Sequence, residues 1–85
     1  MTKKEFLSFV SQQKNLGSVR FSLGFGSKGE IVLYWTNEEG YRVWKVISGN
    51  RGNKPSNANK ERMSKLRRWL NDTRENIDEH VQHHE

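Results

Sequence analysis

The apolar residues between Val19 and Phe25 all fall at odd positions and alternate with polar or small residues at even positions. Two later segments, 30–36 and 41–48, also keep apolar residues at odd positions. Because successive side chains of a strand point to opposite faces, a shared parity predicts a shared face. The pattern therefore predicts three strands with an apolar odd face turned toward the core.

The two connections between these segments are short and end in glycine, at 27–29 and 38–40. A three-residue loop with a final left-handed glycine is typical of antiparallel hairpins, and two such loops preserve the parity. This register places Tyr34 opposite Trp44 and Arg42 across from Thr36. A four-residue second loop would instead turn Trp44 into the core.

A helix is expected before the strands. The segment Thr2-Lys3-Lys4-Glu5 has the form of a capping box, in which Thr2 accepts from a backbone amide. Phe6, Phe9 and Val10 then recur at helical spacing. Gly17 is a typical residue for the end of such a helix.

A second, longer helix follows the strands. Its apolar stripe is spaced by three and four residues and consists of Met63, Leu66, Leu70, Thr73, Ile77 and Val81. The segment before it, 49–58, is rich in glycine and asparagine and holds the only proline. That composition predicts an exposed, mobile basic loop.

Together these elements predict one small domain, 1–85, of the α+β class with the order α-β-β-β-α. Both helices should pack on the odd face of a three-stranded antiparallel meander. The expected bounds are helix one 1–17, sheet 18–48, loop 49–58, helix two 59–82 and tail 83–85. With 32% hydrophobic residues, so short a chain can bury only a thin core.

The composition narrows the function. Fifteen Lys and Arg against ten Asp and Glu give a net charge of +5, which favours a polyanionic partner, with a solubilising surplus of charge as the alternative. The chain has no cysteine and no apolar run of membrane-spanning length. We therefore expect a cytoplasmic protein without a membrane partner.

Cations gather at the start of helix two and acids gather toward its end, which opposes the helix dipole. A helix N-terminus beside basic side chains suits an anion such as phosphate. The candidate phosphate ligands are Arg51, Lys54, Lys60, Arg62, Lys65, Arg67 and Arg68. Local ion pairs, Glu61 with Lys65 and Arg68 with Asp72, are the alternative explanation for part of this cluster.

The even face of the sheet combines cations with large aromatic groups. Its candidate binding residues are Arg20, Tyr34, Arg42 and Trp44. Aromatic rings stack on unpaired bases while neighbouring arginines hold the backbone, and a sheet can also enter the major groove of DNA. Two alternatives remain open: Trp44 is buried, or the face binds another protein.

No set of residues has the pattern of a catalytic site, and we expect neither enzymatic activity nor a cofactor. His80, His83 and His84 have a spacing that can hold a metal, but a solvated helix end is the better interpretation. No metal site is therefore predicted.

The sequence thus predicts a small non-catalytic protein that binds nucleic acid, either DNA or RNA. The alternative is a regulator or inhibitor, of the kind that phages and mobile elements encode, that docks on a host protein. Ile77 and Val81 extend the apolar stripe of helix two beyond the expected length of the sheet. This extension favours a homodimer through helix two.

Overall fold

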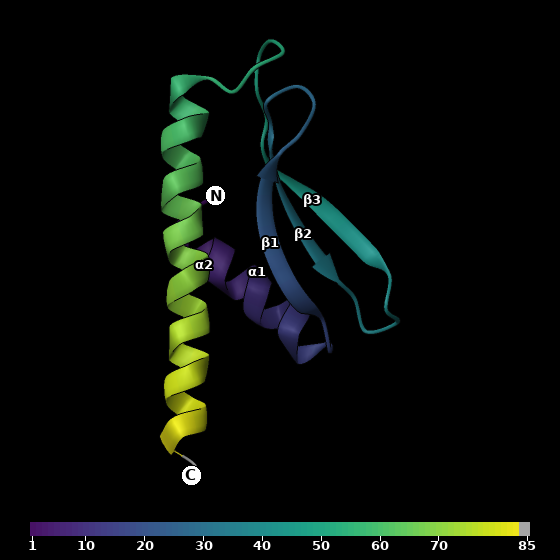
Figure 1. Cartoon of the computed structure of the whole chain (residues 1–85), viewed down its shortest axis with the longest axis vertical. Coiled ribbons are helices and arrows are strands. Elements are labelled where there is room, and N and C mark those ends of the chain that lie inside the picture. The colour runs from purple at the N-terminus through teal and green to yellow at the C-terminus, as the bar shows by residue number, and fades with distance from the viewer. Residues whose placement is uncertain (84–85) are drawn as a thin grey trace.

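In the computed structural model, two helices lie against one face of a three-stranded antiparallel sheet (Figure 1). The structure describes the backbone of residues 1–83 and the side chains of residues 1–73. Its elements are α1 (Lys3–Asn15), β1 (Val19–Phe25), β2 (Ile31–Thr36), β3 (Arg42–Ser48) and α2 (Asn57–His83). The predicted α+β class, element order and meander are confirmed, and α2 begins two residues earlier than expected.

The first helix begins and ends as its sequence predicts. The Thr2 hydroxyl oxygen accepts a hydrogen bond of 3.2 Å from the Glu5 backbone amide, which satisfies one amide of the first turn. Glu5 in turn accepts from the Thr2 hydroxyl at 3.1 Å. Leu16 is the C-cap, and Gly17 adopts a φ of 95° that turns the chain toward β1.

Both hairpins have the predicted three-residue loops. The amide of Gly26 donates to the carbonyl of Glu30 at 2.8 Å, and that of Asn37 donates to the carbonyl of Tyr41 at 2.9 Å. The last loop residues, Gly29 and Gly40, have φ angles of 80° and 89°. Only glycine adopts this conformation without steric cost, so these two residues fix the register of the sheet.

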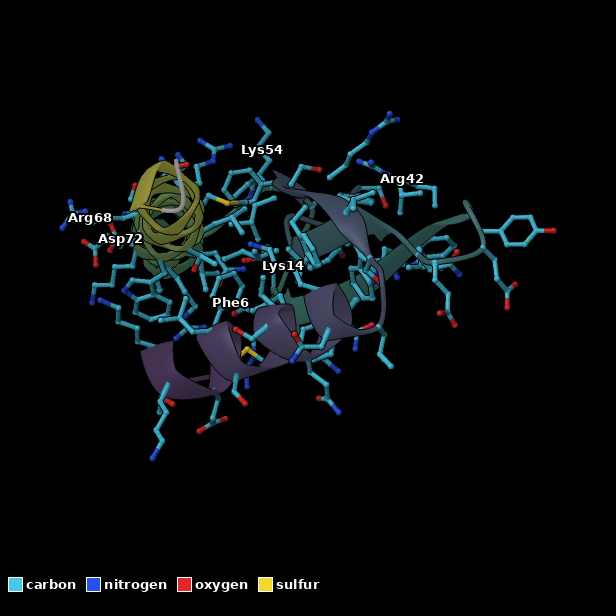
Figure 2. The ribbon with its side chains drawn as sticks, turned by 90° about the horizontal axis from the view of Figure 1, so that it is seen from below. Phe6, Lys14, Arg42, Lys54, Arg68 and Asp72 are labelled. Carbon is cyan, nitrogen blue, oxygen red and sulfur yellow. The ribbon has the colours of Figure 1, made fainter. Side chains whose placement is uncertain are left out.

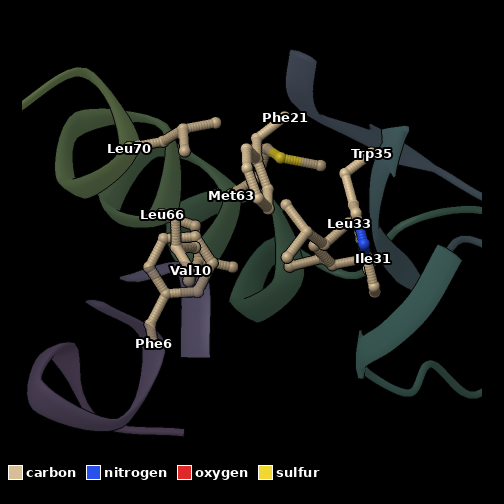
Figure 3. Close-up of a cluster of buried hydrophobic side chains, with 9 residues drawn as sticks. All are labelled: Phe6, Val10, Phe21, Ile31, Leu33, Trp35, Met63, Leu66 and Leu70. Atoms are coloured by element: carbon tan, nitrogen blue, oxygen red, sulfur yellow. The ribbon is translucent and has the colours of Figure 1, made fainter. Parts of the chain in front are cut away.

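The core lies between the odd face of the sheet and the two helices (Figure 3). Its buried members come from α1, the sheet and α2, and they are Phe6, Val10, Phe21, Ile31, Leu33, Trp35, Met63, Leu66 and Leu70. Rings link the layers: the Trp35 ring stacks on that of Phe21 at 6.1 Å and meets Phe9 of α1 edge-on at 5.5 Å. The odd parity therefore identified the buried face of β2.

Two bulges change the faces that parity predicts. Val19 pairs with Thr36 and Ser22 pairs with Tyr34, so that Arg20 and Phe21 together oppose a single residue of β2. Val19 consequently lies on the even face and is half exposed, and its predicted place on the odd face is wrong. Arg20, with a φ of 60°, belongs to the bulge and does not continue the even-face row.

The second bulge lies at the end of β3, where Val46 pairs with Val32 and Ser48 pairs with Ile31. It turns Ser48 to the core side, where its hydroxyl donates to the Asn59 side-chain oxygen of α2 at 3.0 Å. The Asn59 side-chain amide donates to the carbonyls of Gly29 and Gly49 at 3.2 and 3.1 Å. Asn59 thus joins α2 to the β1–β2 turn and to the end of β3.

The loop before α2 is held by a second asparagine. The Asn50 side-chain amide donates to the carbonyls of Lys28 and Lys54 at 2.9 and 2.6 Å, and its oxygen accepts from the Ser56 amide at 3.0 Å. These bonds tie residues 49–56 to the β1–β2 turn. The segment predicted as a loop over 49–58 therefore ends at residue 56, where α2 takes over.

Replacing Asn59 by Ala should lower the free energy of unfolding by about 1–3 kcal/mol, because it removes the partner of the buried Gly29 carbonyl and of the buried Ser48 hydroxyl. Asn59 is only 3% exposed, whereas Asn57 on the first turn of α2 is exposed, so Asn57→Ala is the matched control. Urea titration measures both. Equal midpoints for Asn59→Ala and the wild type would show that the bonds contribute nothing to stability.

The lower turns of α2 run past the end of the sheet (Figure 1). A helix of this length extends further than strands of six or seven residues, at about 1.5 Å per helical residue against about 3.3 Å per strand residue. Ile77 and Val81, on which the predicted homodimer depends, lie outside the residues whose side chains are described, as do His80, His83 and His84.

Candidate nucleic-acid interface

The even face of the sheet lies opposite the helices, and Tyr34 and Trp44 form a cross-strand pair on it. Trp44 is 67% exposed, and none of the described residues covers it. The alternative that Trp44 is buried is therefore wrong. Trp44 thus presents an indole to solvent on the edge strand β3, which pairs with β2, and this is an uncommon position for so large an apolar group.

An arginine is fixed beside this pair. The Arg42 guanidinium lies 5.5 Å from the centre of the Tyr34 ring, and its NH2 donates to the Ser22 hydroxyl at 3.0 Å. The Tyr34 ring lies across Gly24, where an added Cβ would stand 3.5 Å from the ring. Three strands therefore position one cation over one ring, and the guanidinium keeps other donors for a ligand.

A shallow depression of about 360 Å³ opens beside the aromatic pair. Its lining is mostly apolar and consists of Gly26, Glu30, Val32, Tyr34, Trp44 and Val46. Val32 forms its buried base, at 4% exposure, although it lies on the even face. The surface thus combines flat rings with a small hollow.

Glu30 is the one acidic group of this depression, and the sequence patterns did not single it out. Its carboxylate lies against the backbone of Gly26, where a Cβ would come within 1.4 Å of Oε1. The two residues close the first hairpin loop and therefore face each other. A glycine opposite a long side chain at the ends of a hairpin loop is the signal that could have identified this residue.

The cations of α2 do not share one surface. At about 100° per residue, a helix that buries Met63, Leu66 and Leu70 places Lys60 and Arg67 on one flank. Arg62 and Lys65 fall on the opposite flank, beside α1. Figure 2 shows Arg68 projecting away from the sheet. The predicted phosphate cluster is therefore divided among three directions.

One cation on the flank beside α1, Arg62, has a structural role. The Arg62 guanidinium donates to the Ser48 hydroxyl, within the polar contacts around Asn59. Arg62 and Lys65 also line a hollow next to Met1 and Trp69, on the α1 side of α2. These two cations are thus separated from the even face by the body of the domain.

The other flank lies on the same side of the molecule as the even face. In Figure 2, Lys54 and Arg42 both project to the side of the molecule away from α1, from opposite ends of the sheet. Lys60 and Arg67 share that side by helical spacing. We call Lys54, Lys60 and Arg67 the basic flank. All three are exposed, as are Arg20 and Arg51. Between the basic flank and the aromatic pair, β1 carries the small even-face residues Ser22 and Gly24, and Val19 lies on the same face at the start of the strand.

Local ion pairing does not neutralise the described part of α2. Asp72 lies 3.8 Å from Lys3 of α1, and neither Glu61–Lys65 nor Arg68–Asp72 forms a salt bridge among residues 1–73. The first turn of α2 has no acidic residue. Its N-terminus is capped by the Ser56 hydroxyl, which accepts from the Asn59 amide at 3.2 Å. The exposed lysine and arginine side chains of α2 therefore present their positive charge to solvent.

Comparison with known protein families, with curated protein sequences and with solved structures finds no match to this chain. Within residues 1–83, neither helix has the length and apolar character needed to cross a membrane.

Proposed function

We propose that this protein binds nucleic acid without catalysis, through the even face and the basic flank together. The observation that carries the proposal is the arrangement of Trp44, Tyr34 and Arg42: an exposed indole, a neighbouring ring and a guanidinium fixed over it by Ser22. Aromatic side chains stack on bases of any sequence, and arginine adds cation–π and phosphate contacts. The even face supplies the base stacking, and the basic flank extends the phosphate contacts.

The charge distribution supports the same conclusion. A strand whose bases rest on Tyr34 and Trp44 would run its phosphates past Ser22 and Gly24 toward Lys54, Lys60 and Arg67. Ser22 and Gly24 are small, and the Arg42 guanidinium that donates to Ser22 lies on this path, where it can contact a phosphate. The net charge of +5 adds long-range attraction for a polyanion. Arg20, Arg51, Arg62, Lys65 and Arg68 then contribute through this field, away from the direct path.

Salt dependence tests the proposal. Arg67→Ala should reduce the magnitude of the slope of log K against log salt by about one, because one phosphate contact is lost. Arg68→Ala is the matched control: it removes the same charge from the adjacent position, which projects away from the sheet. Fluorescence anisotropy with labelled DNA and RNA, single- and double-stranded, gives the slopes for all three proteins.

The proposed path fails if Arg68→Ala lowers the slope as much as Arg67→Ala, because phosphates would then lie on the outer side of α2. The function itself fails if the wild-type protein binds none of these nucleic acids at low salt.

The second candidate function is a regulator that docks on a host protein. The observation that favours it is the apolar lining of the depression beside Trp44, since Trp, Tyr and Arg are the residues that dominate protein interfaces. Its salt behaviour separates it from the first candidate. Binding through a buried apolar patch releases few counterions, so affinity for such a partner should change little with salt.

A further inference from the structure

We infer that the depression beside Trp44 takes one unpaired base and that Glu30 selects bases with an exocyclic amino group. This inference rests on the proposed function and deepens it, because it names single strands as the ligand. The occupant is a base such as cytosine, held between an apolar floor and the Glu30 carboxylate.

The shape of the depression fits a flat, partly polar ligand. Its volume of about 360 Å³ lies at the lower end of the range of small-molecule sites, about 300–1,000 Å³. Val32 and Val46 offer an apolar surface, and Trp44 and Tyr34 complete the lining with aromatic groups. A planar base can rest against these groups while its edge reaches Glu30 at the rim formed with Gly26.

The carboxylate decides which part of a nucleotide can enter. An ionised carboxylate accepts hydrogen bonds and donates none, so it pairs with an amino group and repels a phosphate. Phosphates are therefore directed to Arg42 and the basic flank, outside the depression. Glu and Asp accept from the N4 amino group of cytosine, whereas thymine and uracil present a carbonyl at that position.

Duplex stacking would prevent the contact with Trp44. In a duplex the faces of a base lie against its neighbours, so Trp44 could not stack on them, although one hydrogen of the cytosine amino group stays accessible in the major groove. A single strand can turn a base outward at little cost and stack it on an aromatic side chain. The exposed Trp44 and the open depression thus favour single strands over duplexes.

The test compares oligo-dC with oligo-dT of equal length, above neutral pH and at one salt concentration. Wild-type protein should bind oligo-dC about tenfold more tightly, which corresponds to about 1.4 kcal/mol and lies within the discrimination expected of a good base contact. In Glu30→Gln, which can both donate and accept, the preference should disappear and affinity for oligo-dT should rise. Glu39→Gln, in the exposed β2–β3 turn, changes the net charge equally and should keep the preference.

Equal affinity of the wild type for the two oligonucleotides, or an unchanged preference in Glu30→Gln, overturns the role of Glu30. The proposed function still stands in that case if Arg67→Ala lowers the salt slope. If Glu30→Gln does not fold, Glu30→Asp retracts the carboxylate without changing charge and should weaken the preference. A duplex bound more tightly than either single strand would overturn the inference as a whole, as would a salt-insensitive protein partner that competes for Trp44.

Discussion

Trp44→Ala is expected to lower the affinity for single-stranded nucleic acid by about 5- to 150-fold while leaving the thermal midpoint close to that of the wild type. Stacking of one base on one aromatic side chain contributes about 1–3 kcal/mol. Because Trp44 is 67% exposed, its removal leaves no cavity in the core, and the cost to folding should stay within about 0.5 kcal/mol. Anisotropy titration and thermal unfolding measure the two effects separately.

Trp44→Phe is the control for this experiment, since it keeps a ring on the even face and should retain most of the affinity. Tyr41→Ala is a second control, because Tyr41 is equally exposed, at 66%, but lies in the second hairpin outside the depression. Undiminished binding by Trp44→Ala would remove the even face from the interface and leave the cations alone. A folding defect in Trp44→Ala would mean that the indole supports the sheet.

The sequence was sufficient for the architecture because the strongest signals are local. Gly29 and Gly40 specify the hairpins, and these two turns bring Tyr34 opposite Trp44 without any knowledge of the rest of the fold. The exposure of Trp44 then depends on which face the helices cover. The odd parity of Phe21, Leu33 and Trp35 indicates that face, because the apolar stripes of the helices need an apolar sheet face to pack against.

The bulges could not be predicted in the same way. Each adds one residue to a strand, and neither Arg20 nor Ile47 is a glycine or proline that would mark the site. One extra residue exchanges the two faces, which is why Val19 and Arg20 do not lie where parity places them. Ser48 and Asn59 carry no sequence signal that marks them as partners, and only the structure shows that they are buried and bind each other.

The division of the cations was also beyond the sequence. Helical spacing separates Arg67 from Arg62, but it does not say which flank meets α1 and which shares a side with the sheet. That assignment needs the contacts of α2 with its neighbours, such as the ion pair between Lys3 and Asp72. Glu30 was missed for a related reason: the hairpin pattern of Gly26 and Glu30 places the two residues opposite each other, but the depression that Glu30 shares with Trp44 results from the pairing of β2 with β3.

Trp35→Ala should destabilise the domain far more than Trp44→Ala, although the two residues lie on adjacent strands of one sheet. Trp35 is 7% exposed and its ring contacts those of Phe9 and Phe21. Truncation of such a residue costs about 3–5 kcal/mol. A domain of this size is expected to have a total stability of about 4–13 kcal/mol, so the loss is a large share of the whole.

Trp35→Phe separates the two contributions of this side chain. The Trp35 Nε1 is buried and has no hydrogen-bond partner among the described residues, so the change to Phe removes an unpaired donor while keeping a ring against Phe9 and Phe21. The gain from losing that donor offsets part of the lost ring volume, and Trp35→Phe should cost much less than Trp35→Ala. Urea midpoints of the three proteins decide the order. A Trp35→Phe variant as unstable as Trp35→Ala would contradict this expectation. It would show that the indole nitrogen has a hydrogen-bond partner that stabilises the core.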